Sequence, residues 1–261
     1  MDASRIDDEL RARAKAGWTG RLTVSDRAGR ELADLYIFEG DLYSVQMRDH
    51  QPHLFTRLVA AGIIDGERQR ECDSAGAPGA RDEFIGRYAV EHGWLPVERL
   101  AEFHSEYLLA GLSAVREASG VSIADEPGAM TNVRCALPSP VADVIASVEL
   151  RTERSRNVWV GVGASAGPRE TVLAWRGVRG VAPFVAPELA AFAAEVDGVR
   201  SVDELADSCG FTRAEAEFLT AALVNDGLVE VAGVKSLPAA TCLVPEDAAR
   251  AGAGARGVVG P

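Results

Sequence analysis

Two helix-start signals near the end of the chain limit its possible folds more than any other feature. Ser201-Val202-Asp203-Glu204 and Thr212-Arg213-Ala214-Glu215 each place a hydroxyl residue three positions before a glutamate. This is the pattern of a capping box, in which the hydroxyl and the carboxylate bind the free amides of a helix's first turn. Gly210 lies between the two signals and suits the end of the first helix, because glycine adopts positive φ without strain. We therefore predict two helices joined by a tight turn.

The residues around these signals predict how the two helices pack. Apolar side chains recur at helical spacing in both of them: Leu205, Ala206, Ala216, Leu219 and Leu223. Gly227 suits the end of the second helix, and Leu228–Val231 has the composition of a strand. Helix, turn, helix and strand in this order predict a winged helix-turn-helix, which we place within residues 157–245.

The first part of the chain predicts an antiparallel sheet. Trp18–Ser25, Leu35–Phe38 and Leu42–Met47 are apolar or alternate between apolar and polar residues, as strands do. Phe38-Glu39-Gly40-Asp41 joins the last two with a glycine where a two-residue hairpin turn requires positive φ. We therefore predict a β-meander.

Helices are predicted after the meander. Apolar residues have helical spacing in Leu54–Ile63, Phe84–Ala89 and Pro96–Val115. Gly62 and Gly93 are each followed by an apolar pair and then by Glu-Arg at the same offsets, which predicts a stacked pair of helical hairpins. The expected fold class is α+β, with the meander and helical hairpins in residues 1–156. A disordered tail is expected over 246–261, which has almost nothing to bury.

The region between these parts predicts another helix and a hairpin. Ser139-Pro140 suits a helix start, and Arg151, Arg154 and Arg156 suit the end of that helix. Val158–Val162 and Thr171–Trp175 then predict two strands joined by a turn.

The overall charge limits the partners that the chain is expected to have. A net charge of −12 and a pI of about 4.9 oppose attraction to nucleic acid and to anionic lipid. No run of about 18 apolar residues predicts a membrane span, and Met1–Lys15 has no apolar signal core. No two of the four cysteines have Cys-x-x-Cys spacing, which argues against a zinc ribbon or a redox pair. Without a secretory signal, we expect reduced thiols and a cytoplasmic protein.

The predicted helix-turn-helix is itself acidic. Arg213 is the only basic residue between Ser201 and Val231, whereas a helix that reads DNA needs cations for phosphates and base edges. We therefore interpret this module as a surface for a protein partner and keep DNA binding as the alternative. The residues that we single out for partner or DNA contact are Arg213, Glu217, Thr220, Arg200 and Lys235.

Two patterns that resemble catalytic or metal sites are better explained by loops. Residues 163–167 match Gly-x-Ser-x-Gly, but Pro168 follows at once and every histidine precedes Ser165, so a turn is favoured over a nucleophile. Asp49, His50 and His53 offer too few ligands for zinc, although a metal in this loop stays open. We expect no catalytic residue, no cofactor and no metal.

Two family resemblances add to these expectations. Trp18–Val24, Gly29 and Leu35–Ser44 resemble the PATAN-type family, a module of bacterial signalling proteins, over roughly residues 15–156. That resemblance implies regulatory protein contacts and no catalysis. Val196–Leu205 resembles the Asp-Gly-x-x-Ser-Val-x-Glu-Leu run of PqqD-like winged helices, which implies peptide binding through a sheet edge and a helix.

Together these patterns favour a non-enzymatic cytoplasmic signalling adaptor that binds a protein partner through both modules. The alternative is a transcriptional regulator that binds DNA through the C-terminal winged helix. The acidic charge favours the adaptor, and the order of the modules, sensor-like then winged helix, favours the regulator. The identity of the partner, the signal and any self-association stay open.

Overall fold

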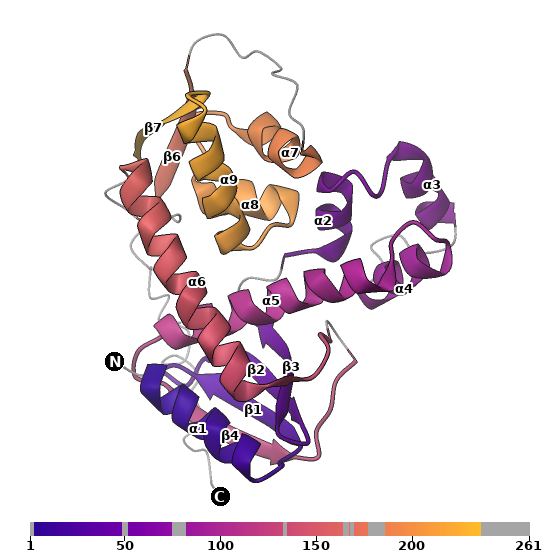
Figure 1. The fold of residues 1–261 in the computed structure, drawn as a ribbon, viewed down its shortest axis with the longest axis vertical. Coiled ribbons are helices and arrows are strands. Elements are labelled where there is room, and N and C mark those ends of the chain that lie inside the picture. Colours follow the sequence, from indigo (N-terminus) through magenta and orange to yellow (C-terminus); the bar gives the residue numbers. More distant parts are fainter. Residues whose placement is uncertain are drawn as a thin grey trace, which may run out of the picture.

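The fold of the chain is taken from a computed structural model, which describes residues 3–48, 52–74, 82–132, 135–163, 167, 170–176 and 186–235 (Figure 1). Its elements are an antiparallel meander followed by helices, so the predicted α+β class is confirmed. The predicted tail at 246–261, most of the Gly-x-Ser-x-Gly turn, and Asp49 and His50 lie outside the described residues. None of the described helices is long and apolar enough to cross a membrane.

The N-terminal part is built on a five-stranded antiparallel sheet in the order β4-β1-β2-β3-β5. Its strands are β1 (Gly20–Ser25), β2 (Glu31–Phe38), β3 (Asp41–Met47), β4 (Ser122–Pro127) and β5 (Ser139–Pro140). The predicted meander is therefore confirmed as its centre. The two outer strands were not predicted, because β4 is mostly exposed and β5 is only a residue pair.

The turn between β2 and β3 has the predicted hairpin geometry. Phe38 pairs with Asp41, and the two residues between them have positive φ, 50° at Glu39 and 91° at Gly40. The Gly40 amide donates to the Trp18 carbonyl at 3.0 Å. A Cβ on Gly40 would lie 2.7 Å from the Ala14 carbonyl oxygen. Any other residue at position 40 would therefore have a strained backbone and would also clash with Ala14.

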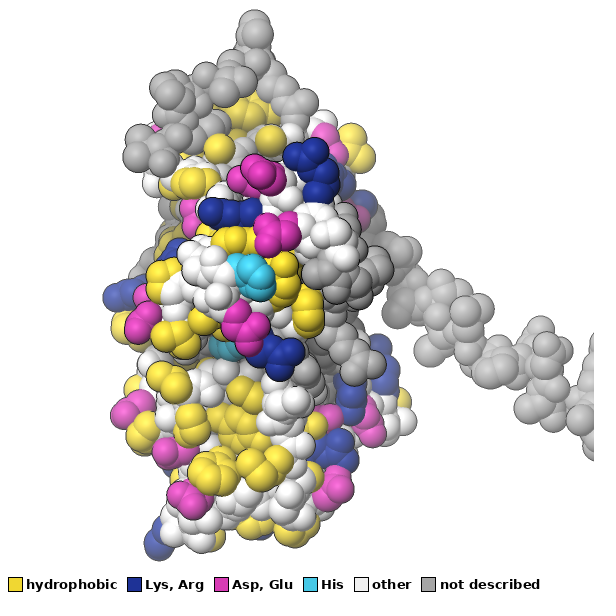
Figure 2. All heavy atoms as spheres, turned by 90° about the vertical axis from the view of Figure 1, so that its right-hand side faces the viewer, with side chains coloured by type: hydrophobic (Ala, Val, Ile, Leu, Met, Phe, Trp, Pro, Cys, Tyr) yellow, Lys and Arg dark blue, Asp and Glu magenta, His cyan; other side chains and the backbone are white. Residues whose placement is uncertain are grey.

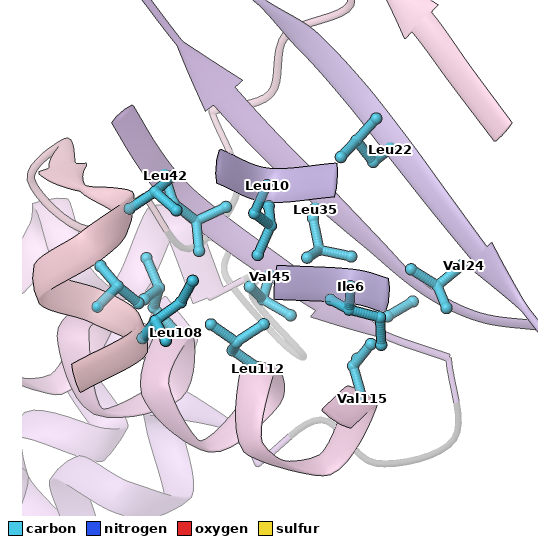
Figure 3. Close-up of a cluster of buried hydrophobic side chains, with 14 of the residues drawn as sticks. Ile6, Leu10, Leu22, Val24, Leu35, Leu42, Val45, Leu108, Leu112 and Val115 are labelled. Atoms are coloured by element: carbon cyan, nitrogen blue, oxygen red, sulfur yellow. The ribbon is translucent and has the colours of Figure 1, made fainter. Parts of the chain in front are cut away.

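One face of the sheet is covered by α1 (Ala3–Lys15), α5 (Val97–Glu117) and the first half of α6 (Val141–Val162). Figure 3 shows Ile6 and Leu10 of α1 meeting Leu35 of the sheet and Leu112 of α5 in one core. Burying this apolar surface is what holds the helices on the sheet. The sequence did not predict α1, because its two core residues stand among charged ones.

The helical hairpins form a second core from α2 (Leu54–Ala60), α3 (Gly66–Ser74), α4 (Asp82–Glu91) and the start of α5. The predicted repeat is confirmed at the level of single hydrogen bonds. Gly62 and Gly93 both have φ of 68°. After the first glycine, the next two amides both donate to the Leu58 carbonyl, and after the second, the next two both donate to the Ala89 carbonyl. Equal turns thus follow α2 and α4.

The structure corrects three predictions around α6. Residues 158–162 are the last part of this helix, so the strand predicted there is wrong. Ser139 does not cap the helix: its hydroxyl donates to the Leu137 carbonyl at 3.0 Å, and Pro140 holds the cap position. The arginines at 151, 154 and 156 lie in mid-helix rather than at its end. The β-branched residues near 160 favour strand by propensity, but packing of Trp159 on the C-terminal core favours the helix.

The C-terminal part contains α7 (Pro187–Glu195), α8 (Val202–Cys209), α9 (Arg213–Asn225) and a sheet of β6 (Thr171–Trp175) and β7 (Val229–Val234). Both predicted capping boxes are present, and Gly210 ends α8 with φ of 68°. The strand at 171–175 is confirmed, but it pairs with β7 and not with 158–162. The helix-turn-helix and the strand after it are therefore observed, while a winged-helix assignment stays a prediction.

Candidate functional site

Helix α6 joins the N-terminal sheet to the C-terminal helices (Figure 1). Its first half contributes Val141, Val144 and Val148 to the first core. Its second half packs along α9, and Trp159 contacts the C-terminal core. The boundary predicted at residue 156 therefore falls inside one continuous helix. The candidate site lies where α5, α6 and α9 meet.

Two of the residues predicted to bind a partner are buried side chains of α9. Glu217 is 5% exposed and Thr220 is fully buried. The Ser155 hydroxyl of α6 donates to the Glu217 carboxylate, and the Thr220 hydroxyl has no hydrogen-bond partner among the described residues. Glu217 thus belongs to the contact between α6 and α9, and neither side chain is exposed to a partner.

Arg213, the one basic residue of the helix-turn-helix, is held by an internal carboxylate. Its Nε donates to Asp203 Oδ1 at 3.0 Å, and its Nη2 donates to Asp203 Oδ2 at 2.9 Å. Glu117 Oε2 lies 3.9 Å from Nη1 of the same guanidinium. A paired arrangement of two parallel hydrogen bonds is the geometry that an arginine would otherwise offer to a phosphate.

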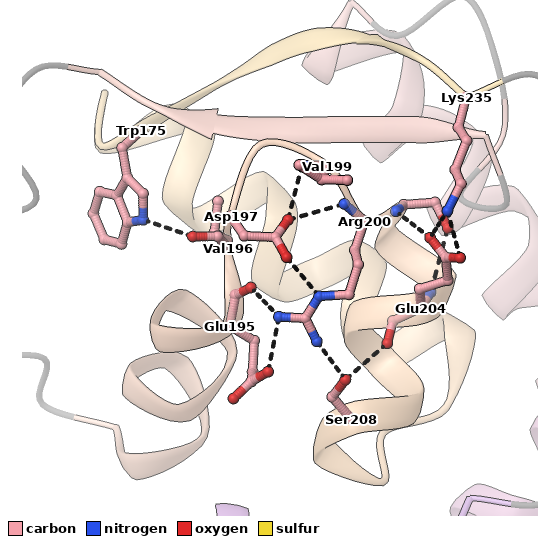
Figure 4. A network of polar contacts seen from close by, with 10 residues as sticks. Trp175, Glu195, Val196, Asp197, Val199, Arg200, Glu204, Ser208 and Lys235 are labelled. Atoms are coloured by element: carbon pink, nitrogen blue, oxygen red, sulfur yellow. Dashed lines mark hydrogen bonds and ion pairs between the residues drawn. The ribbon is translucent and has the colours of Figure 1, made fainter.

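Arg200 is held by a network in the loop before α8 (Figure 4). The Asp197 carboxylate accepts the Val199 amide at 2.8 Å, the Arg200 amide at 2.9 Å and the Arg200 Nε at 2.7 Å. Arg200 also donates to Ser208 Oγ and to the Glu195 carbonyl, each at 2.7 Å. The hydrogen bonds from Arg200 lower the pKa of Asp197 to about 2, so this carboxylate stays ionised and fixes the turn.

Lys235 is the last of the five predicted residues. Its Nζ lies 2.6 Å from both oxygens of Glu204, the glutamate of the first capping box. The structure therefore brings Arg213 and Glu217 together near α6 and places Arg200 and Lys235 elsewhere, around the start of α8.

A cavity of about 390 Å³ lies between the sheet, α5, α6 and the start of α9; we call it the inner cavity. One wall is apolar and comes from β3 and α5, with Val45, Met47, Ala110, Gly111 and Ala114. The opposite wall is polar and comes from α6 and α9, with Arg151, Thr152, Ser155, Thr212, Arg213 and Glu217. This volume lies within the range of small-molecule sites, roughly 300–1,000 Å³.

On the polar wall, the two arginines form ion pairs with described residues and the glutamate does not. The Arg151 guanidinium binds the Glu106 carboxylate with both terminal nitrogens, and the Thr212 hydroxyl donates to Glu106 at 2.7 Å. Arg213 is bound by Asp203. Glu217 has no ion pair with any described residue. Burial raises the pKa of Glu217, which the hydrogen bond from Ser155 partly offsets.

A second depression, of about 230 Å³, lies on the other side of Arg151; we call it the outer groove. It is lined by Leu109 of α5, by Ser147, Leu150, Arg151 and Arg154 of α6, and by Phe218 of α9. Leu150 is 50% exposed and Phe218 is 44% exposed. Arg154 is exposed and forms no ion pair with a described residue.

Leu150 and Phe218 were not among the residues predicted to bind a partner. A signal was present for Phe218, which stands outside the apolar positions Ala216, Leu219 and Leu223 that recur at helical spacing in the sequence of this helix. An aromatic residue away from the core-facing side of a helix is a candidate for contact with a partner. No comparable signal marks Leu150, which lies inside the predicted helix but outside its buried positions Val141, Val144 and Val148.

No group of three residues that could hold a metal occurs among the described residues. His53, the described member of the predicted loop, lies at the start of α2, where its side chain makes no capping bond. Cys72, Cys135 and Cys209, the cysteines that the structure describes, form no disulfide with one another. Burial raises the pKa of the Cys209 thiol to about 12, so it stays protonated and unreactive.

The face that lies on the right in Figure 1 is shown from the front in Figure 2. Acidic and basic side chains are interleaved there with hydrophobic ones, and they form no continuous basic surface among the described residues. That face therefore does not offer the stripe of cations that binding to a phosphate backbone requires.

Comparisons of the chain with family models, with curated proteins and with solved structures find no match. The PATAN-type and PqqD-like resemblances therefore stay predictions, and the function is inferred from the residues of this chain alone.

Proposed function

We propose that the chain is a non-enzymatic, cytoplasmic regulatory adaptor that binds a protein partner at the outer groove. The observation that supports this most is the pair of exposed apolar side chains, Leu150 and Phe218, beside Arg154, which has no ion pair with a described residue. Interfaces between proteins are enriched in aromatic residues and arginine at their energetic centres. The lack of a disulfide among the three described cysteines, Cys72, Cys135 and Cys209, agrees with a reducing compartment.

The chemistry of the groove suggests what the partner offers. Leu109, Leu150 and Phe218 provide an apolar floor, onto which aliphatic side chains can pack. Arg154 at the rim can donate to a carboxylate. The occupant in this proposal is therefore a protein segment with aliphatic side chains next to an aspartate or glutamate.

The alternative, DNA binding through α9, has less support. Arg213 is bound by Asp203, and the buried face of α9 carries Glu217 and Thr220. A DNA-binding mode would have to release Arg213 from Asp203 before it could reach a phosphate. Carboxylates near the helix would also repel the DNA backbone.

The test is site-specific photo-crosslinking of the full chain in its native host. A benzophenone amino acid is placed at Phe218, and at Val199 as a control that is exposed but does not line the groove. The expected result is a protein adduct at residue 218 that is absent at residue 199. The adduct partner is then purified and must bind the unmodified chain directly.

Adducts that are equal at the two positions, or a purified partner that binds Phe218→Ser as well as the wild type, would contradict the proposal. Crosslinks to nucleic acid at residue 218 would favour the DNA-binding alternative.

A further inference from the structure

The inner cavity is separate from the outer groove and has no role in the adaptor function proposed above. It is bounded by parts of the chain that are distant in sequence: β3, α5, α6 and the first two turns of α9. Small side chains on α5 leave the space open, and they include Ala110, Gly111 and Ala114. A Cβ on Gly111 would lie 2.7 Å from a methyl carbon of Val45, so helix and strand approach closely at the apolar end of the cavity.

The two walls of the cavity would suit the two ends of an amphipathic molecule. The β3 and α5 side offers Val45, Met47 and Ala114 to an apolar body. The α6 and α9 side offers Thr152, Ser155 and Glu217 to a polar group. Ligand sites commonly combine such an apolar lining with a few polar groups that fix the orientation.

The ion pairs of the polar wall indicate which charge the polar group of a ligand should carry. Both guanidiniums of the wall already bind carboxylates, Arg151 that of Glu106 and Arg213 that of Asp203. Neither is therefore free for an anionic ligand. Glu117 also lines the cavity, but its side chain is mostly in solvent and lies near Arg213.

Glu217 is the carboxylate that remains. It accepts a hydrogen bond from the Ser155 hydroxyl, and the attraction of Arg213, which is itself bound by Asp203, only partly offsets the cost of its burial. A buried carboxylate without an ion pair of its own loses its hydration and is not fully compensated. An ammonium group would supply both the opposite charge and up to three hydrogen-bond donors.

We propose that the inner cavity is a binding site for a small organic cation, a primary ammonium group on a short apolar body. The ammonium donates to Glu217, while the hydroxyls of Thr152 and Ser155 offer their oxygens to its remaining donors. The guanidiniums of the wall stay paired with their own carboxylates. The apolar body packs against the β3 and α5 wall. This site stands whether or not the outer groove binds a protein.

The test is isothermal titration of the full chain at pH 7.5 with two probes that share a phenylethyl body. Phenethylamine carries the ammonium group, and 3-phenylpropionate carries a carboxylate on the same apolar body. The proposal predicts that phenethylamine binds at least tenfold more tightly than the carboxylate. The charge test is Glu217→Gln, and its control is Glu153→Gln, an exposed carboxylate on the same helix as Ser155.

A second variant, Ala114→Leu, fills the cavity without changing its charge. Phenethylamine affinity is expected to fall at least tenfold in Glu217→Gln and in Ala114→Leu, and by less than twofold in Glu153→Gln. Thermal unfolding of each variant shows whether it is folded. Glu217→Gln removes a charge and Ala114→Leu adds volume, so a folding defect in one variant still leaves the other as a test. No binding of phenethylamine to the wild type, tighter binding of 3-phenylpropionate, or binding that survives both cavity variants would overturn the proposal.

Discussion

The guanidinium of Arg57 in α2 donates two hydrogen bonds to one oxygen of Glu215 in α9, at 3.1 Å from Nε and 2.9 Å from Nη2. The other oxygen of Glu215 accepts the Thr212 amide at 2.9 Å, so one carboxylate completes a capping box and receives a cation from a distant helix. Arg57 also lies over the rings of Phe103 and Phe211, at 4.8 and 4.7 Å from their centroids. This buried arginine connects the helical hairpins to the C-terminal part.

Replacing Arg57 by methionine is expected to destabilise the protein by about 3 kcal/mol, because removal of one partner leaves a buried charge uncompensated. Burial raises the pKa of Glu215 and Arg57 lowers it, so the pKa should rise further in Arg57→Met. A raised pKa disfavours the ionised form, so the loss should be larger at pH 7.5 than at pH 5. Urea unfolding at the two pH values measures both effects.

The control for that experiment is Arg99→Met. Arg99 also stacks over Phe103, at 4.9 Å, but its side chain is 46% exposed and its ion pairs reach solvent. Its loss is expected to cost under about 1 kcal/mol. Equal losses in the two variants, or a loss in Arg57→Met that does not change with pH, would show that Arg57 acts only by packing.

The second prediction concerns Gly210, in the turn of the helix-turn-helix, with Gly227 as its control. Gly210 has φ of 68°, and a Cβ there would lie 2.7 Å from the Arg57 amide nitrogen and 2.7 Å from the His53 carbonyl oxygen. Gly227 has nearly the same φ, 69°, but a Cβ on it would meet no described atom within 4 Å. Gly227→Ala should cost about 1 kcal/mol through backbone strain alone. Gly210→Ala should cost at least about 1 kcal/mol more, because backbone atoms of α2 must also move.

Chemical unfolding of the two alanine variants gives the comparison directly. A Gly210→Ala variant that is no less stable than Gly227→Ala would mean that α2 and the turn after α8 are not in close contact in solution.

The buried Glu217 predicts an unusual dependence on pH. Because burial raises its pKa above the ordinary value of 4.5, the folded protein binds the proton more tightly than the unfolded chain does. The contribution of Glu217 to stability is therefore present below about pH 4.5 and is lost as the pH rises through the pKa of the folded protein. Glutamine resembles the protonated side chain, so Glu217→Gln should equal the wild type in acid and become relatively more stable toward neutral pH.

Urea unfolding of the wild type and of Glu217→Gln between about pH 4 and pH 7 checks this sign. A variant that loses relative stability as the pH rises would show that the ionised carboxylate is stabilised by its surroundings, which would also weaken the case for an uncompensated charge in the inner cavity.

Local signals in the sequence predicted the parts of the fold that depend on a few neighbouring residues. The hairpin at Gly40, both capping boxes and the equal turns at Gly62 and Gly93 follow from hydroxyl-to-glutamate spacing or from glycine at positive φ. Each of these motifs satisfies its own backbone groups, so distant packing has little influence on it.

The parts that the sequence did not predict depend on contacts between distant segments. Residues 158–162 have strand-like composition and become helical because Trp159 packs into the C-terminal core. Arg213 has the residue type and position of a DNA contact, and only the structure shows that Asp203 holds it. Neither cavity could be predicted, because each is formed by three or more elements that local patterns do not bring together.

The ion pair of Arg213 makes a direct prediction about DNA. Labelled genomic fragments titrated with the full chain, followed by fluorescence anisotropy at low and moderate salt, should show no submicromolar binding. Submicromolar binding that weakens steeply with salt and disappears in Arg213→Ala would support the regulator alternative, since counterion release produces such a salt dependence.

The adaptor proposal itself depends on the affinity of the crosslinked, purified partner for the chain and for two variants of the outer groove. Phe218→Ser and Leu150→Ser remove exposed apolar contacts without disturbing a core, and Val199→Ser is the matched control. The proposal predicts that each groove variant weakens binding at least tenfold, which corresponds to about 1.4 kcal/mol or more, and that the control changes it less than twofold. Equal affinities for all four proteins would contradict the assignment of the outer groove as the partner's binding site.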